Sequence, residues 1–232
     1  MKSQSNGMVN ENLQSDAPAP AQPDGRALAL LAVPARHRSA IDTLLALDSR
    51  LAGIVRATRE PIVGQMRLTW WHDALTKLDT APAPAEPLLR DVQAHLLPAG
   101  VGGARLAAMI DGWEELIVSD PLAAETLHRH ADARGAGLFA AAGLVLGGDS
   151  PLLAPAGRGW AFADLAGHLS APAAATRAAD SAEQEFAQAF SASWPSRLRP
   201  VGVLSLVARL DAAPGSAIAK ALKVGRFRIF GR

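Results

Sequence analysis

Asp48 is an acidic residue inside an apolar row, and this placement makes it a candidate for chemistry. Leu44, Leu45 and Leu51 lie three or four residues from it, the spacing of one helix face between residues 40 and 58. A carboxylate buried on such a face requires a charged or hydrogen-bonding partner. The alternative is a polar residue at the edge of the row, which general burial statistics favour.

Two groups of histidines have the residue types of a metal site but not its spacing. In His128-Arg129-His130 the two imidazoles are two residues apart, so on a helix they diverge and cannot meet at one ion. The neighbours His72 and Asp73 diverge in the same way. We therefore expect no metal at either place, and a solvated helix start at 128–130.

A glycine-rich segment, Gly-Ala-Gly-Leu-Phe-Ala at 135–140, fits the degenerate dinucleotide-binding pattern GxGxxA. That pattern requires a preceding strand, whereas the preceding LHRHADAR is polar and helical in character. The segment therefore indicates helix packing. Small residues such as Gly135, Gly137 and Gly143 let neighbouring helices, or a ligand, approach closely.

The composition excludes several classes of protein. The 232 residues carry 23 Lys and Arg against 22 Asp and Glu, and this net charge of +1 is not that of a nucleic-acid binder. The absence of cysteine excludes disulfides, thiolate metal centres and a thiol nucleophile. No apolar stretch approaches about 18 residues and no secretory signal is recognisable, so we expect a cytoplasmic or membrane-peripheral protein.

The elements that position these residues are expected to be helices. Roughly a fifth of the chain is Ala and strand-favouring residues are sparse, which predicts an all-α, single-domain bundle of about 8–9 helices. Residues 1–25 read as a disordered tail, 26–214 as the helical domain and 215–232 as a basic C-terminal helix or tail. The expected helices are 40–58 capped by Ser39, one beginning at Pro61, 106–117 stopped near Asp120-Pro121, 122–146, 157–169, 176–192, 196–211 and 215–224.

Two segments between or after these helices also carry predictions. An Ala/Pro-rich stretch at 79–87 is expected to be a loop. The helix from Pro61 carries a row of apolar residues that is predicted to face the core, and Trp71 and Leu75 widen this row. The row comprises Ile62, Met66, Trp70, Ala74 and Leu78.

The C-terminal segment combines cations with apolar residues. From Ala212 onward there is no acidic residue, and the segment contains Lys220, Lys223, Arg226, Arg228 and Arg232 among Leu222, Phe227, Ile229 and Phe230. A segment of this kind can lie on an anionic membrane surface, so 218–232 is a candidate for peripheral membrane contact. The alternative is a solvated terminus.

The stretch ATREPIVGQMRLTWWHDAL, residues 57–75, resembles one in the squalene/phytoene synthase family, above all the branch that includes a mitochondrial complex I assembly factor. Residues 30–55 look like the family's opening helices, 135–147 like its central Gly/Ala helix and 159–172 like a later active-site helix. Together these segments cover most of residues 28–210. The resemblance implies an all-α fold of the isoprenoid synthase type.

Active members of that family join two prenyl diphosphates head to head, using two Asp-rich motifs that hold Mg²⁺. Alignment places Ala52-Gly53-Ile54-Val55-Arg56 where the first motif has Asp-Asp-Ile-Val-Asp. For the second motif, the residues opposite the expected Gln, Asn, Arg and two Asp are Ala163, Ala166, Leu169, Ser170 and Ala174. Neither motif survives, and the chain also lacks the tyrosines of active members.

The leading expectation is therefore a family member without Mg²⁺–diphosphate chemistry and without a cofactor. It would act as a binding or assembly scaffold, with a protein partner in respiratory complex assembly or an isoprenoid-like lipid as ligand. The alternative is an active prenyltransferase that uses atypical metal ligands, and Asp48 and Asp164 are its candidates.

The candidate contact residues are Arg36, Arg38, Arg67, Trp70, Trp71 and Arg134. The arginines could bind an anionic head group and the tryptophans could line an apolar cavity. Solvated surface for the arginines and ordinary core packing for the tryptophans are the alternatives.

Overall fold

The computed structural model describes residues 25–58, 60–119 and 122–232. Over these residues the chain forms helices and no β-strand, which confirms the predicted all-α class. The predicted tail at 1–25 lies outside the described residues except for Gly25, which is the first residue of a helix.

The helices follow one another with short connections. In chain order they are α1 (Gly25–Ala32), α2 (Ala35–Ala57), α3 (Pro61–Lys77), α4 (Pro87–His95), α5 (Gly103–Val118), α6 (Ala124–His130), the π-helical turn η2 (Ala131–Ala136), α7 (Gly137–Leu146), α8 (Leu153–His168), α9 (Pro172–Ala189), α10 (Arg199–Ala212) and α11 (Ala217–Phe230). Two 3₁₀ turns, Leu97–Ala99 and Ser196–Leu198, precede α5 and α10.

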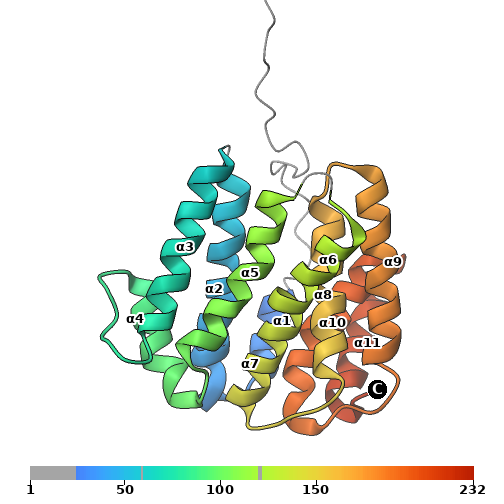
Figure 1. Cartoon of the computed structure of the whole chain (residues 1–232). Coiled ribbons are helices and arrows are strands. Elements are labelled where there is room, and N and C mark those ends of the chain that lie inside the picture. The colour runs from blue at the N-terminus through green and yellow to red at the C-terminus, as the bar shows by residue number, and fades with distance from the viewer. Residues whose placement is uncertain (1–24, 59, 120–121) are drawn as a thin grey trace, which may run out of the picture.

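Figure 1 shows these helices as a bundle, with α3 and α4 at one edge and α9 at the other. The rod formed by α6, η2 and α7 lies between α5 and α8. α3 packs along α5, α8 along α9, and α1 and α11 both pack against α10. The side chains fill a single apolar core whose largest fully buried members include Trp194, Phe139 and Phe162.

Four of the described α-helices have a proline as their first or second residue, where the first turn of a helix does not need its N–H. These prolines are Pro61, Pro87, Pro172 and Pro200. The prediction that a helix begins at Pro61 is confirmed.

Several predicted boundaries were wrong. α2 begins at Ala35 after Pro34, so Ser39 lies inside this helix and does not cap it. The loop expected at 79–87 ends one residue earlier, because Pro87 opens the short helix α4, which the sequence pattern did not reveal. The stop expected at 120–121 lies outside the described residues, and α5 ends at Val118.

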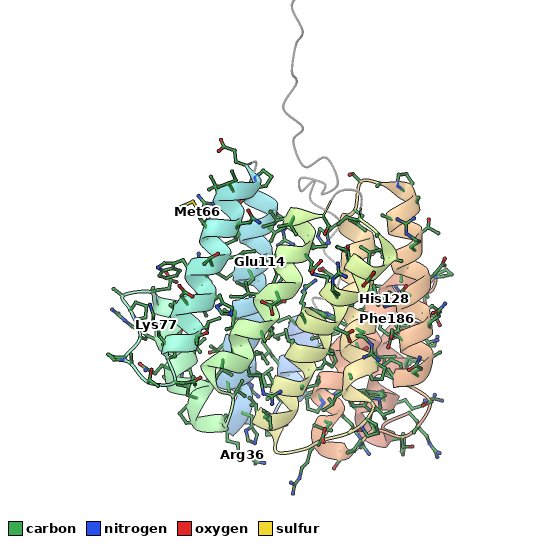
Figure 2. All side chains as sticks on the ribbon, in the orientation of Figure 1. Arg36, Met66, Lys77, Glu114, His128 and Phe186 are labelled. Carbon is green, nitrogen blue, oxygen red and sulfur yellow. The ribbon has the colours of Figure 1, made fainter. Side chains whose placement is uncertain are left out.

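The predicted core face of α3 was wrong in its first half. Ile62 and Met66 are 71% and 68% exposed and Trp70 is 48% exposed, and Figure 2 shows Met66 pointing away from the bundle. The buried side consists of Gly64, Leu68, Trp71, Ala74 and Leu75. Both sides of α3 are apolar, so periodicity alone could not tell which one meets the core.

Candidate functional site

Arg134 is the centre of the candidate site. It lies in η2, where the predicted long helix 122–146 is interrupted by π-helical geometry between α6 and α7. A π turn adds a residue to the helical repeat and redirects the side chains that it carries, and such turns are frequent at functional sites. Here the guanidinium is directed inward, and the side chain is 3% exposed.

The guanidinium joins two carboxylates from distant helices. Its Nε and Nη2 donate to the two oxygens of Asp48 on α2, at 2.8 and 2.9 Å. Its Nη1 donates to Asp164 on α8, at 2.6 Å. The structure therefore brings together Asp48, Arg134 and Asp164, all three of which the sequence offered as candidates, in what we call the ion cluster.

Two indole rings hold the cation from both sides. The guanidinium carbon lies 4.3 Å from the ring centre of Trp113 on α5 and 4.5 Å from that of Trp160 on α8. Stacking on aromatic faces suits the planar guanidinium and is stronger where water is excluded. The sequence pattern did not indicate that these two tryptophans belong to the site. Trp113 and Trp160 approach Arg134 only through tertiary packing.

Glycines allow the close approach that the ion cluster requires. A Cβ on Gly135 would lie 2.2 Å from the carbonyl oxygen of Gly157, and a Cβ on Gly157 would lie 2.2 Å from that of Gly135. The backbones of η2 and α8 therefore cross in direct contact, one residue from Arg134. This confirms, for Gly135, the prediction that small residues in this segment serve helix packing.

The charges of the ion cluster stabilise one another. Burial alone would lower the pKa of Arg134, but the charges of Asp48 and Asp164 outweigh it and hold that pKa above its ordinary value. Burial acts to raise the pKa of Asp164, yet the charge of Arg134, with a smaller effect of His168, lowers it. Arg134 and Asp164 are therefore held in their charged forms.

His130 lies beside the ion cluster as a buried, neutral imidazole, so the predicted solvated helix start was wrong at this residue. Its Nδ1 lies 2.7 Å from the carbonyl oxygen of Gly112, which can only accept, so Nδ1 carries the proton. Its ring meets Trp113 edge to face. Burial, together with the nearby charge of Arg134, lowers the pKa of His130 to about 3.

The donor set does not fit a Mg²⁺ ion. A site for this ion needs carboxylates whose oxygens face the metal, whereas both carboxylates here are bonded to Arg134. Across the described ranges, no three His, Asp or Glu side chains lie close enough together to share a metal ion.

The interior next to the ion cluster leaves little room for a ligand. The cavity that Asp48 and Trp160 line is about 230 Å³ and is bounded on its other sides by α1 and α10. The space between α2, η2 and α8 is taken up by the Arg134 side chain and the two indoles.

The other predicted contact residues lie elsewhere. Arg36 and Arg38 are exposed near the start of α2, and Arg67 is exposed on α3, where it lines an open surface hollow with Arg50. Trp70 is half exposed, and Trp71 is packed in the core. Of the six predicted contact residues, therefore, only Arg134 belongs to the ion cluster.

The chain matches no family model, no curated protein and no solved structure. None of the described helices has the length and apolarity needed to cross a membrane.

Proposed function

We propose that this chain is a squalene/phytoene synthase-like protein without Mg²⁺–diphosphate chemistry, in which an isoprenoid-synthase-type bundle acts as an assembly scaffold. The proposed partner is a protein of respiratory complex assembly, because the resemblance is strongest to the branch that includes the complex I assembly factor. The fold type and the partner class both rest on that resemblance.

The observation that carries the proposal is the ion cluster. An enzyme that ionises a prenyl diphosphate needs carboxylates that are free to hold Mg²⁺. Here Asp48 and Asp164 are bonded to Arg134, at distances of 2.6 to 2.9 Å. Drawing them to a metal would leave a buried guanidinium without its counter-charges, which costs several kcal/mol, in the range of about 3–5 kcal/mol.

The positions aligned with the lost metal motifs support the same conclusion. Ala52 and Ala174 are buried in the apolar core, as is Leu169, and Ala163 and Ala166 pack against it. These side chains contribute to packing at places where the resembling enzymes have polar groups around a cavity.

The space beside the ion cluster is too small for an isoprenoid ligand, and this favours a protein partner for the proposed scaffold. A binding site for a drug-sized molecule occupies about 300–1,000 Å³, which exceeds the roughly 230 Å³ beside Asp48. Binding is therefore expected on the outer surface of the bundle.

A genetic experiment tests the assembly role. The gene would be deleted in its host and assembled complex I measured by its activity in native gels. We expect assembled complex to fall in the deletion strain and to be restored by the wild-type chain. The triple variant Asp48→Asn, Arg134→Met and Asp164→Asn has an uncharged ion cluster. It should also restore the assembled complex if it accumulates to the wild-type level.

The result that would contradict the proposal is normal assembled complex in the deletion strain. Loss of a prenyl-chain lipid in that strain, restored by the wild-type chain but not by the neutral variant, would favour the enzymatic alternative.

A further inference from the structure

The outward side of α11 carries an apolar row that no other described element covers. Ile218, Leu222 and Ile229 are 75%, 70% and 65% exposed, and their spacing puts them on one side of the helix. The opposite side is anchored by Val224 and Phe227, and Phe227 stacks edge to face on Trp194. The burial of Phe227 corrects the sequence analysis, which grouped it with the apolar residues of a candidate membrane segment.

Cations flank this row. Lys223, Arg226 and Arg228 are exposed, and no ion pair within the described part of the chain holds any of them. Lys220, on the bundle side, is paired with Asp211. Residues 217–232 contain five cations and no acid, which leaves a net charge of −4 on residues 1–216. The positive charge is therefore concentrated on this one helix.

A groove of about 470 Å³ opens alongside α11, between this helix, α10 and α1. Its walls are largely apolar, with Leu28, Val207 and Val224 among them, and Lys220 and Arg228 lie at its edge. The groove extends the apolar surface beside the exposed row, and Asp211, which also lines it, is paired with Lys220.

We propose that α11 binds the surface of an anionic lipid bilayer. Ile218, Leu222 and Ile229 would enter the boundary between head groups and acyl chains, while Lys223, Arg226 and Arg228 meet lipid phosphates. The helix would lie in the plane of the membrane, and the rest of the bundle would face the aqueous side.

Charge distinguishes this face from the other exposed apolar row, on α3. The row of Ile62, Met66 and Trp70 on α3 lies among two cations, Arg67 and Lys77, and two acids, Glu60 and Asp73, so the charges around it sum to zero. An anionic bilayer is therefore the occupant that matches α11 and not α3. The inference does not depend on the assembly role proposed above.

Cosedimentation of the full chain with lipid vesicles tests the proposal. Vesicles of phosphatidylcholine alone would be compared with vesicles that also contain phosphatidylglycerol. We expect binding to the anionic vesicles only, weakened at least about tenfold when salt is raised to about 0.5 M. Leu222→Glu should weaken binding by about tenfold or more, and Lys223→Gln with Arg226→Gln should weaken it as well.

The matched control is Met66→Glu on α3, which introduces the same charge at an equally exposed apolar residue. This variant should bind vesicles as the wild type does. All changed residues are exposed, and circular dichroism and unfolding checks would establish that each variant is folded. Equal binding to neutral and anionic vesicles, no binding at all, or unchanged binding by the α11 variants would each overturn the proposal. A loss in Met66→Glu as large as that in the α11 variants would do so too, because binding would then not be specific to α11.

Discussion

At the scale of residues, the molecule is organised around one buried cation. Arg134 is hydrogen-bonded to Asp48 and Asp164 and stacks on Trp113 and Trp160. Five side chains therefore form one group of direct contacts around the guanidinium. A buried ion pair is not in itself a source of stability, because two charges lose their hydration. Removing only one partner is nevertheless costly, and this asymmetry gives the first prediction.

Arg134→Met should destabilise the folded protein by about 3–5 kcal/mol, because it leaves the buried Asp48 and the partly buried Asp164 without their counter-charge. The free energy of unfolding in urea measures this effect. Neutralising the carboxylates in the same chain, with Asp48→Asn and Asp164→Asn, should recover most of the loss. The control is Arg129→Met, which removes a half-exposed arginine paired with Glu115 and Glu125 and should have little effect. Equal losses in the Arg134 and Arg129 variants would contradict the importance of the ion cluster.

His130 gives a prediction about pH. Its pKa in the folded protein is about 3, against about 6.5 in an unfolded chain. Between these values the unfolded state binds one more proton than the folded state, so stability rises with pH and falls on acidification. Going from about pH 7 to about pH 5 should remove about 2 kcal/mol through this residue.

Urea unfolding at the two pH values measures that change, and the variant His130→Gln should show a smaller loss than the wild type. Burial and the nearby Arg134 charge favour the neutral imidazole, and they outweigh the Gly112 carbonyl and the Asp164 charge, which favour the protonated form. An identical pH dependence in both proteins would show that His130 is not the group responsible.

At the scale of elements, the ion cluster depends on where two backbones meet. η2 and α8 cross at Gly135 and Gly157, with each glycine against the other's carbonyl oxygen. The crossing brings Arg134 within reach of Asp164, and the π turn directs its side chain toward Asp48 as well.

Gly135→Ala should therefore destabilise the protein by about 1–3 kcal/mol or more, because its Cβ meets backbone that cannot move aside easily. Gly53→Ala on α2 is the matched control, since nothing lies within 4 Å of its Cβ position. This control should stabilise the protein by about 0.5–1 kcal/mol through helix propensity. Thermal unfolding of both variants provides the comparison, and the prediction fails if Gly135→Ala is as stable as Gly53→Ala.

The sequence predicted the helices better than the contacts between them. Composition indicated an all-α fold, and Asp48 stood out as a polar residue in an apolar row. The ion cluster joins residues 86 positions apart in the chain, and local periodicity carries no information about such a pair. The π turn could not be predicted either, because its sequence is typical of an ordinary helix. In α3 both sides are apolar, so periodicity could not indicate which side packs in the core.

At the scale of the whole molecule, the described helices share one apolar core, and the distinctive surfaces are on the outside. Exposed apolar rows lie on α3 and α11; the row of α11 is bordered by cations without acids, whereas the charges around the row of α3 are of both signs. A scaffold that contacts a membrane through one helix and a protein through another surface would have this distribution. An enzyme acting on a long prenyl chain would instead require an open interior with free acidic groups.

The central claim is that Arg134 occupies the carboxylates at the bundle centre, Asp48 and Asp164, in place of a metal ion. The most direct test is to incubate the purified wild-type chain with Mg²⁺ and farnesyl or geranylgeranyl diphosphate and to measure the pyrophosphate released. The proposal predicts no release above the protein-free control and no rise in the unfolding temperature at saturating Mg²⁺ and substrate. Sustained release that is lost in Asp48→Asn and in Asp164→Asn would contradict it.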